Sequence, residues 1–264
     1  MIALTSVFEK AKIENRAVLI GFITAGFPNI EKSYEIAKAM VDGGVDAIEV
    51  GFPYSDPVMD GPVIQRAGEE ALRNGTKSKD VLELVSKISK LGVPTLVMTY
   101  WNPIEKYGVD KFAQDLSKAG GVGLITPDLT FEEAETWNRV AGENKLAKVF
   151  VLAPSSSEER IKKVSNICSG FIYAASLMGV TGTRDSISGN ASELVSRIKS
   201  HSNLPVAVGL GVSNAEQAKE VAGYADGVIV GSAFIKTIQN ASDFEAGLSK
   251  VRELAKALKV GVTK

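Results

Sequence analysis

Acidic side chains stand out in residues 49–65, where a short apolar run is followed by a loop rich in proline and glycine. Glu49 lies at the end of the apolar run, and Asp56 and Asp60 lie on the loop. A carboxyl group on a buried strand is costly unless it is paired or used in chemistry. A proline-rich loop is stiff, so its acids point in definite directions. The segment alone fits general acid–base catalysis and, equally, a solvated loop beside a salt-bridged Glu49.

Other side chains that carry chemistry are scarce where the predicted strands end. No lysine stands there, so a Schiff-base mechanism lacks its nucleophile. The only histidine, His201, precedes a predicted strand and is expected at its opposite end, which argues against a histidine-ligated metal. Cys168 continues an apolar helical stripe and is expected in the core. Carboxylates and phenols remain, and they suit acid–base work without a metal or cofactor: Glu49, Asp56, Asp60, Tyr100, Asp128 and Tyr173.

Glycines in the last third of the chain give a second signal. Gly209 and Gly211 end one predicted strand, and Gly231 and Ser232 follow the next and lead into a short helix expected at Ala233–Ile238. Glycine lets backbone N–H groups approach an anion, and a helix N-terminus adds partial positive charge. Each glycine alone would fit a plain turn, but the two pairs together favour a phosphate site.

Short apolar runs alternate with helical patterns along the whole chain. Eight runs are nearly continuous in apolar residues, as strands covered on both faces should be. These predicted strands are Val18–Thr24, Ala47–Gly51, Thr95–Tyr100, Gly123–Asp128, Lys148–Ala153, Phe171–Ser176, Pro205–Gly211 and Gly227–Gly231. The alternation predicts an α/β protein with a (β/α)8 TIM barrel, one domain over residues 1–264, whose active site lies at the C-terminal strand ends. A doubly wound open sheet is the alternative, but residues 24–28 are not the glycine-rich nucleotide fingerprint it usually carries.

The sequence also predicts several helix starts and one long loop. A Ser or Thr followed three residues later by Glu predicts a helix start at four places: Thr130, Ser156, Ser213 and Ser242. The segment Ser176–Asn190 is long for a loop between a strand and a helix, and it is rich in glycine and hydroxyl residues. It is either a lid that closes over substrate or an ordinary flexible loop.

Composition narrows the class of protein. The 264 residues are 45% hydrophobic and 23% charged, with a net charge of −1, so no general attraction to nucleic acid or to an anionic membrane is expected. No apolar run has the length of a membrane span, and the first ten residues lack the apolar stretch of a signal peptide. A single cysteine cannot form an internal disulfide, and a cytoplasmic location is expected.

With these pieces in place, Pro53–Gln65 resembles the P-x-S-D-P-x-x-D-G-P-x-I-Q signature of the tryptophan synthase alpha subunit family at every fixed position. Shorter matches run along the chain at Gly21–Gly26, Met98–Pro103, Pro127–Leu129, Gly179–Gly182, Val208–Gly211 and Gly231–Ala233. The resemblance implies a TIM barrel with an extra N-terminal helix and a short phosphate-binding helix after the eighth strand. It also implies a lyase that cleaves indole-3-glycerol phosphate to indole and glyceraldehyde 3-phosphate, with no metal or cofactor in this chain.

The same resemblance implies roles for individual residues. The catalytic acids would be Glu49 and Asp60. The lid residue that meets Asp60 on closure would be Thr181, with Tyr173 close to the substrate. The indole pocket would be lined by Phe22, Tyr100, Pro127 and Val151. The phosphate would be held by Gly182, Gly211, Gly231 and Ser232. A beta subunit that carries PLP, in an αββα heterotetramer for tryptophan biosynthesis, would be contacted near Pro53 and Asp56.

Two positions depart from the family pattern, and several readings stay open. Leu210 stands where many members have Phe, and Trp101 stands where Tyr or Ala is commoner, so both could change the shape of the pocket. Neither removes a catalytic group. The open readings are another phosphate-binding barrel lyase or isomerase, a stand-alone indole-3-glycerol phosphate lyase, and a mainly regulatory subunit that activates its partner.

Overall fold

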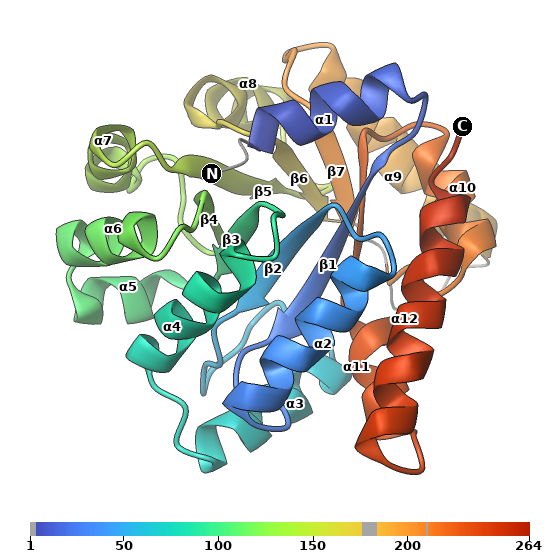
Figure 1. Ribbon diagram of the computed structural model, residues 1–264. Coiled ribbons are helices and arrows are strands. Elements are labelled where there is room, and N and C mark those ends of the chain that lie inside the picture. Colours follow the sequence, from blue (N-terminus) through green and yellow to red (C-terminus); the bar gives the residue numbers. More distant parts are fainter. Residues whose placement is uncertain (1–3, 176–183, 210) are drawn as a thin grey trace.

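Eight parallel strands form a closed barrel in the order of the sequence (Figure 1). The computed structural model describes residues 4–175, 184–209 and 211–264. The strands are β1 Val18–Thr24, β2 Ala47–Gly51, β3 Thr95–Met98, β4 Gly123–Thr126, β5 Ala147–Leu152, β6 Ile172–Ala175, β7 Val206–Gly209 and β8 Gly227–Val230. Pairing of β1 with β8 closes the barrel, which confirms the predicted architecture.

The first two strands have their predicted bounds, whereas the other six end one or two residues earlier than predicted. The apolar pattern of the sequence continues past the last paired residue of these strands. In β3 and β4 the reason is visible, because Tyr100 and Pro127 lie beyond the strand ends and line a pocket. Apolar residues at the end of a barrel strand therefore serve the pocket as well as the sheet.

Twelve helices accompany the strands in the described part of the chain. They are α1 Leu4–Ile13, α2 Ile30–Asp42, α3 Pro62–Arg73, α4 Ser78–Ser89, α5 Trp101–Tyr107, α6 Val109–Lys118, α7 Glu135–Glu143, α8 Glu158–Ile167, α9 Arg184–Lys199, α10 Ala215–Ala222, α11 Ser232–Gln239 and α12 Phe244–Gly261. The helix α1 lies across one end of the barrel (Figure 1), where Leu4 and Phe8 are buried and the Phe8 ring lies 5.7 Å from that of Phe171. It is the expected extra N-terminal helix, and it covers the N-terminal strand ends.

Helix starts were predicted one residue too early at three places. The expected caps were Ser156, Ser213 and Ser242, and the observed caps are Ser157, Asn214 and Asp243, each of which accepts a hydrogen bond from the backbone N–H three residues on. Adjacent residues can both cap a helix, and Asn and Asp are at least as good as Ser. The prediction at Thr130 was wrong, because its hydroxyl bonds Glu133 but α7 begins only at Glu135.

Residues outside the acidic set occupy plain structural positions. Cys168 is buried, its thiol donates to the carbonyl groups of Lys148 and Phe171, and burial raises the pKa of this thiol to about 11. It is a core residue, as expected. His201 lies between α9 and β7, where its ring hydrogen-bonds Glu158 at 2.7 Å.

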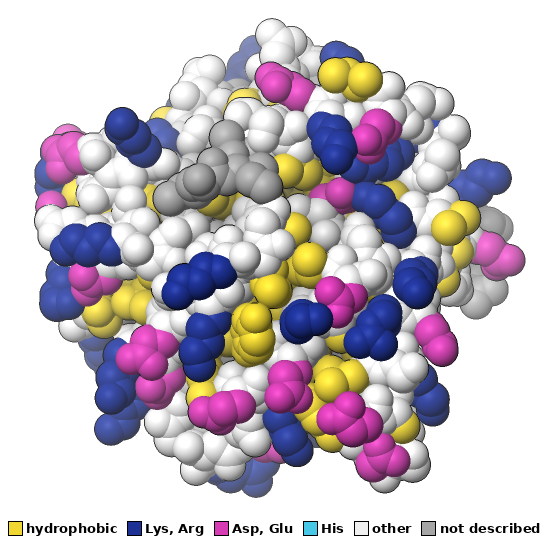
Figure 2. Space-filling model, in the orientation of Figure 1, with side chains coloured by type: hydrophobic (Ala, Val, Ile, Leu, Met, Phe, Trp, Pro, Cys, Tyr) yellow, Lys and Arg dark blue, Asp and Glu magenta, His cyan; other side chains and the backbone are white. Residues whose placement is uncertain are grey.

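The surface carries charges of both signs. Figure 2 shows Lys and Arg side chains interspersed with Asp and Glu over the face seen in Figure 1, in keeping with a net charge of −1. Among the described residues, no helix combines the length and the apolar character needed to cross a membrane.

Candidate active site

Glu49 is a fully buried carboxyl group inside the barrel. It is the third of the five residues of β2, one inward-facing position below the strand end where the sequence analysis had put it. Its neighbours in register are Phe22 on β1 and Leu96 on β3. Neither carboxyl oxygen has a hydrogen-bond partner in the structure, and burial raises the pKa of Glu49 to about 8. This carboxyl group is therefore mostly protonated at neutral pH.

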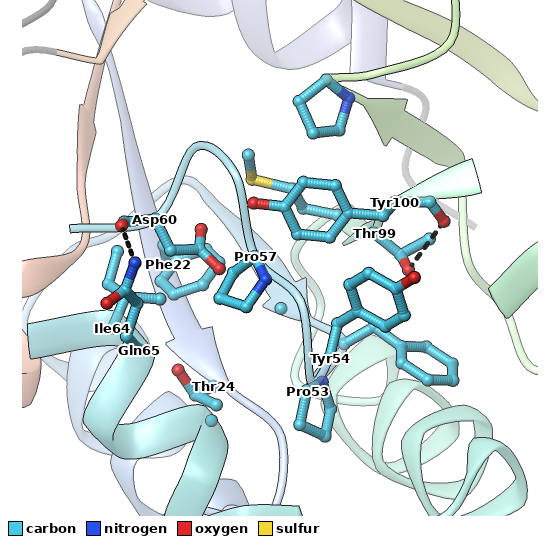
Figure 3. A pocket seen from close by; sticks show the side chains of 15 residues that line it. Phe22, Thr24, Pro53, Tyr54, Pro57, Asp60, Ile64, Gln65, Thr99 and Tyr100 are labelled. Atoms are coloured by element: carbon cyan, nitrogen blue, oxygen red, sulfur yellow. Dashed lines mark hydrogen bonds between the residues drawn. The ribbon is translucent and has the colours of Figure 1, made fainter. Parts of the chain in front are cut away.

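Asp60 lies on the loop of residues 52–61 between β2 and α3, called the Asp60 loop below. Two hydrogen bonds hold its backbone. The Gln65 side-chain N–H donates to the Asp60 carbonyl at 2.9 Å (Figure 3), and the Met59 N–H donates to the Tyr100 hydroxyl at 2.9 Å. Burial raises the pKa of Asp60, and the Tyr100 hydroxyl opposes that rise. The two acids thus sit in different surroundings, one dry and unpaired and one beside a hydroxyl group.

A pocket of about 420 Å³, including space open to solvent, lies at the C-terminal ends of the first strands (Figure 3). Four residues predicted for catalysis or for the indole pocket are in its wall: Phe22, Asp60, Tyr100 and Pro127. The rest of the wall is largely apolar, with residues such as Pro53, Tyr54, Pro57, Ile64 and Met98. An apolar pocket with few polar groups is typical of a site for a small, largely apolar ligand.

Tyr173 on β6 lies near both acids. Burial raises its pKa well above the ordinary value, and the charges of Glu49 and Asp60 raise it further, so all three groups share one region. Its hydroxyl occupies the space where a Cβ at Gly209 would be, which explains glycine at that position. Val151 on β5 is partly buried, packs in the barrel interior and pairs in register with Tyr173.

The ends of β7 and β8 place glycines at the rim of the barrel. Gly211 has a φ of 65°, a left-handed conformation that glycine adopts without strain. Gly231 follows β8 and is the N-cap of α11, whose first residue is Ser232. A Cβ at Gly231 would lie 3.2 Å from the Cβ of Phe22, so this rim borders the pocket wall. The predicted short helix is therefore present and begins one residue earlier than expected.

The Asp60 loop presents its apolar residues unevenly. Pro53 is buried in the pocket wall, whereas Val58 and Met59 are 78% and 42% exposed. Asp56 is exposed and accepts a hydrogen bond from the Ser55 hydroxyl. Phe52, at the start of the loop, packs on the core.

Some expected site residues take other places. Asp128 caps α5, because its carboxylate accepts a hydrogen bond from the Trp101 N–H at 3.0 Å. The residues Thr181, Gly182 and Leu210 lie outside the described residues. Within the described ranges, no three His, Cys, Asp or Glu side chains gather as a metal site would require.

Sequence reasoning gave no role to several polar residues of the pocket, among them Gln65 and Thr24. Gln65 was part of the quoted signature but received no role, although a long amide in the first turn of a helix can reach the preceding loop. Thr24 ends β1, is 4% exposed, and has a hydroxyl without a hydrogen-bond partner in the structure. Its place at the end of a predicted strand was the signal that could have found it.

Comparisons with known proteins agree on one family. A family model described as tryptophan synthase alpha chain matches residues 8–263. The tryptophan synthase alpha chain of Thermobifida fusca is 54% identical over 256 residues, which cover 96% of this chain and 95% of that one. A structure of Mycobacterium tuberculosis tryptophan synthase superposes with a TM-score of 0.92 at 49% identity, covering 99% of this chain and 98% of that one. The alpha subunit from Legionella pneumophila has a TM-score of 0.89 at 34% identity, with 99% and 98% covered.

Proposed function

The chain belongs to the tryptophan synthase alpha chain family, and from that premise we propose that Glu49 and Asp60 are its catalytic acids. The family reaction is the cleavage of indole-3-glycerol phosphate to indole and glyceraldehyde 3-phosphate, and this chain is a carbon–carbon lyase of tryptophan biosynthesis. The observation that carries the assignment is the buried, unpartnered Glu49 with its raised pKa, in the region that Asp60 and Tyr173 share.

The retro-aldol cleavage needs three proton movements, and two unlike carboxyl groups can divide them. Indole C3 must gain a proton, the glycerol hydroxyl beside the breaking bond must lose one, and the indole N–H must be assisted as the ring becomes an indolenine. Glu49, protonated at neutral pH, donates to C3, and the carboxylate then left accepts the hydroxyl proton. Asp60 assists the N–H as a carboxylate; burial raises its pKa, and the Tyr100 hydroxyl favours the ionised form because it opposes that rise.

The substrate's two ends fit two parts of the site. Its indole ring would lie against Phe22, Tyr100, Pro127 and Val151, with the Tyr173 hydroxyl near the reacting carbon atoms. Its phosphate would bind the backbone N–H groups of Gly182, Gly211, Gly231 and Ser232. The N-terminus of α11 and the positive φ of Gly211 support this, because both allow N–H groups to face an anion. Thr181 would contact Asp60 when the lid closes.

A beta subunit is the partner that this family implies. We propose that this chain and the beta subunit form an αββα heterotetramer in the cytoplasm, with contacts near Pro53 and Asp56. The exposed Val58 and Met59 support a partner at this loop, since they are apolar, solvent-facing and adjacent to Asp60. PLP would belong to the beta subunit, and the cleavage in this chain would need no cofactor. Indole is small and apolar, so direct passage to the partner would avoid its loss.

Turnover of indole-3-glycerol phosphate with and without purified beta subunit tests the proposal. We expect cleavage by the isolated chain, faster cleavage in the complex, and a large loss of both in Glu49→Gln. Equal rates with and without the partner would favour a stand-alone lyase. No cleavage by the isolated chain, together with a faster beta reaction on mixing, would favour a mainly regulatory subunit.

A further inference from the structure

We propose that Gln65 and the Tyr100 hydroxyl are positioning residues that hold Asp60 in its working place through the backbone of the Asp60 loop. The inference rests on the proposed role of Asp60 and extends it to two side chains of the same pocket. Neither side chain needs to touch the reacting atoms for this role.

The two hydrogen bonds bracket the Asp60 peptide unit. The Gln65 side chain donates to the Asp60 carbonyl at 2.9 Å, and the Tyr100 hydroxyl accepts from the N–H of the preceding residue, Met59, at 2.9 Å. Gln65 belongs to α3, and Tyr100 is the residue between the end of β3 and α5 that occupies the N-cap position. The loop is therefore fastened from two separate elements that the barrel holds in place.

The part of the loop around Asp60, residues 55–61, offers little else to hold it. Ser55, Asp56, Val58, Met59 and Gly61 are all exposed. The helix α3 that follows begins without a side-chain cap, and Gly61 at its N-cap has no neighbour within 4 Å of a would-be Cβ. Without the two hydrogen bonds, the residues on both sides of Asp60 would have few packing contacts to restrain them.

Tyr100 has a second route to Asp60. Its oxygen accepts the Met59 N–H, which leaves its own proton free to point toward the carboxylate. The hydroxyl lowers the pKa of Asp60, and the charge of Asp60 in turn raises that of Tyr100. Tyr100 is thus both part of the apolar wall and a partner of the acid, and a Phe at this position would keep only the first role.

Steady-state kinetics of Gln65→Met and Tyr100→Phe, with beta subunit present, test the proposal. Gln65→Met keeps the length of the side chain but cannot donate, so we expect kcat to fall about 10- to 100-fold with KM changed far less. Tyr100→Phe should also lower kcat and move the acidic limb of the kcat–pH profile to higher pH, because Asp60 loses the group that lowers its pKa. The control variants are Gln114→Met on α6 and Tyr107→Phe on α5, which make the same chemical changes away from the pocket.

The decisive comparison uses Asp60→Asn as the background. If Gln65 acts through Asp60, Gln65→Met has no further effect on the residual kcat of Asp60→Asn. An equal fold loss in both backgrounds would overturn the inference while leaving the role of Asp60 intact. A normal rate in Asp60→Asn would overturn both. Should Gln65→Met fail to fold, Tyr100→Phe decides alone, and an unmoved acidic limb counts against the proposal.

Discussion

At the scale of single residues, the protonation of Glu49 distinguishes its proposed role from that of Asp60. Glu49 has no hydrogen-bond partner in the structure, so nothing offsets the effect of burial on its pKa. Burial also raises the pKa of Asp60, but the Tyr100 hydroxyl opposes that rise. The two acids are therefore held differently, and in the proposed mechanism Glu49 supplies a proton while Asp60 acts as a carboxylate.

The first prediction concerns Glu49→Gln, which keeps the shape of the side chain and removes its titratable proton. Loss of a general acid–base group should lower the rate of indole-3-glycerol phosphate cleavage about 10²–10⁴-fold. In the wild type, kcat/KM should fall as pH rises through about 8, because Glu49 then loses its proton. A stopped assay from pH 6 to 9.5 checks both points. Near wild-type cleavage by a folded Glu49→Gln protein would end the assignment.

Burial of Glu49 should also cost stability at alkaline pH. Its pKa is about 8 in the folded chain against 4.5 for an ordinary Glu, so between these values the folded state binds the extra proton. The contribution of Glu49 to stability is then largest below pH 4.5 and falls as pH rises toward 8, by on the order of a few kcal/mol. Denaturant unfolding from pH 5 to 8.5 should show this decline in the wild type and a flatter profile in Glu49→Gln. Parallel profiles of stability against pH in the wild type and in Glu49→Gln would contradict this prediction.

At the scale of elements, strand ends were harder to predict than strand centres. The runs at β1 and β2 were correct to the residue, whereas the runs at β3 and β4 were extended over Tyr100 and Pro127. Both residues are in the pocket wall, where apolar character serves ligand contact and not strand pairing. Three helix caps were predicted one residue too early for a different reason, because in each case two adjacent polar residues were both able to cap the helix.

Gly211→Val tests the phosphate site at the ends of β7 and β8. Gly211 has a φ of 65°, which a β-branched residue strongly disfavours, and a side chain there would block close approach of a phosphate. We expect KM for indole-3-glycerol phosphate to rise at least tenfold. Gly75→Val, at another positive φ outside the site, controls for backbone strain. If KM stays at its wild-type value in a folded Gly211→Val protein, the phosphate binds elsewhere.

The helix α1 should matter for stability and little for turnover. Phe8 is 6% exposed and packs on Phe171 at the covered end of the barrel, so Phe8→Ala should cost about 3 kcal/mol of unfolding free energy. Ile13 on the same helix is 86% exposed, and Ile13→Ala should change stability by about 0.5 kcal/mol or less. Chemical denaturation measures both, and kcat should be unchanged in both. Equal stabilities would mean that α1 does not seal the barrel.

At the scale of the whole molecule, the Asp60 loop is the place where a partner could reach the acid. A partner raises activity only if it prefers the working arrangement of this loop over others. Pro53 stiffens the loop from inside the pocket wall, so Pro53→Gly should weaken stimulation by the beta subunit more than it weakens the activity of the isolated chain. Titration with purified beta subunit to saturation measures this. The same stimulation in both proteins would mean that coupling runs elsewhere.

The barrel and the positions of its candidate acids could be predicted because both correspond to recognisable sequence patterns. Eight apolar runs and the Pro53–Gln65 motif were readable without coordinates. Which residues of the Asp60 loop are exposed could not be predicted from the sequence. Pro53 and Val58 are both apolar, and only packing decides which one faces solvent. The contacts of Gln65 were equally hidden, because a polar residue on a helix start is usually solvated.

The pairing of β1 with β8, which are the first and last strands along the sequence, has a consequence for biosynthesis. A ribosome that adds 5–20 residues per second needs roughly 10–40 s to pass from the first strand to the last. During that time β1 carries an open edge, which is the kind of surface that recruits other nascent chains. The barrel can close only after residues 227–230 have left the exit tunnel, so the free edge of the first strand stays uncovered until the last strand has been synthesised.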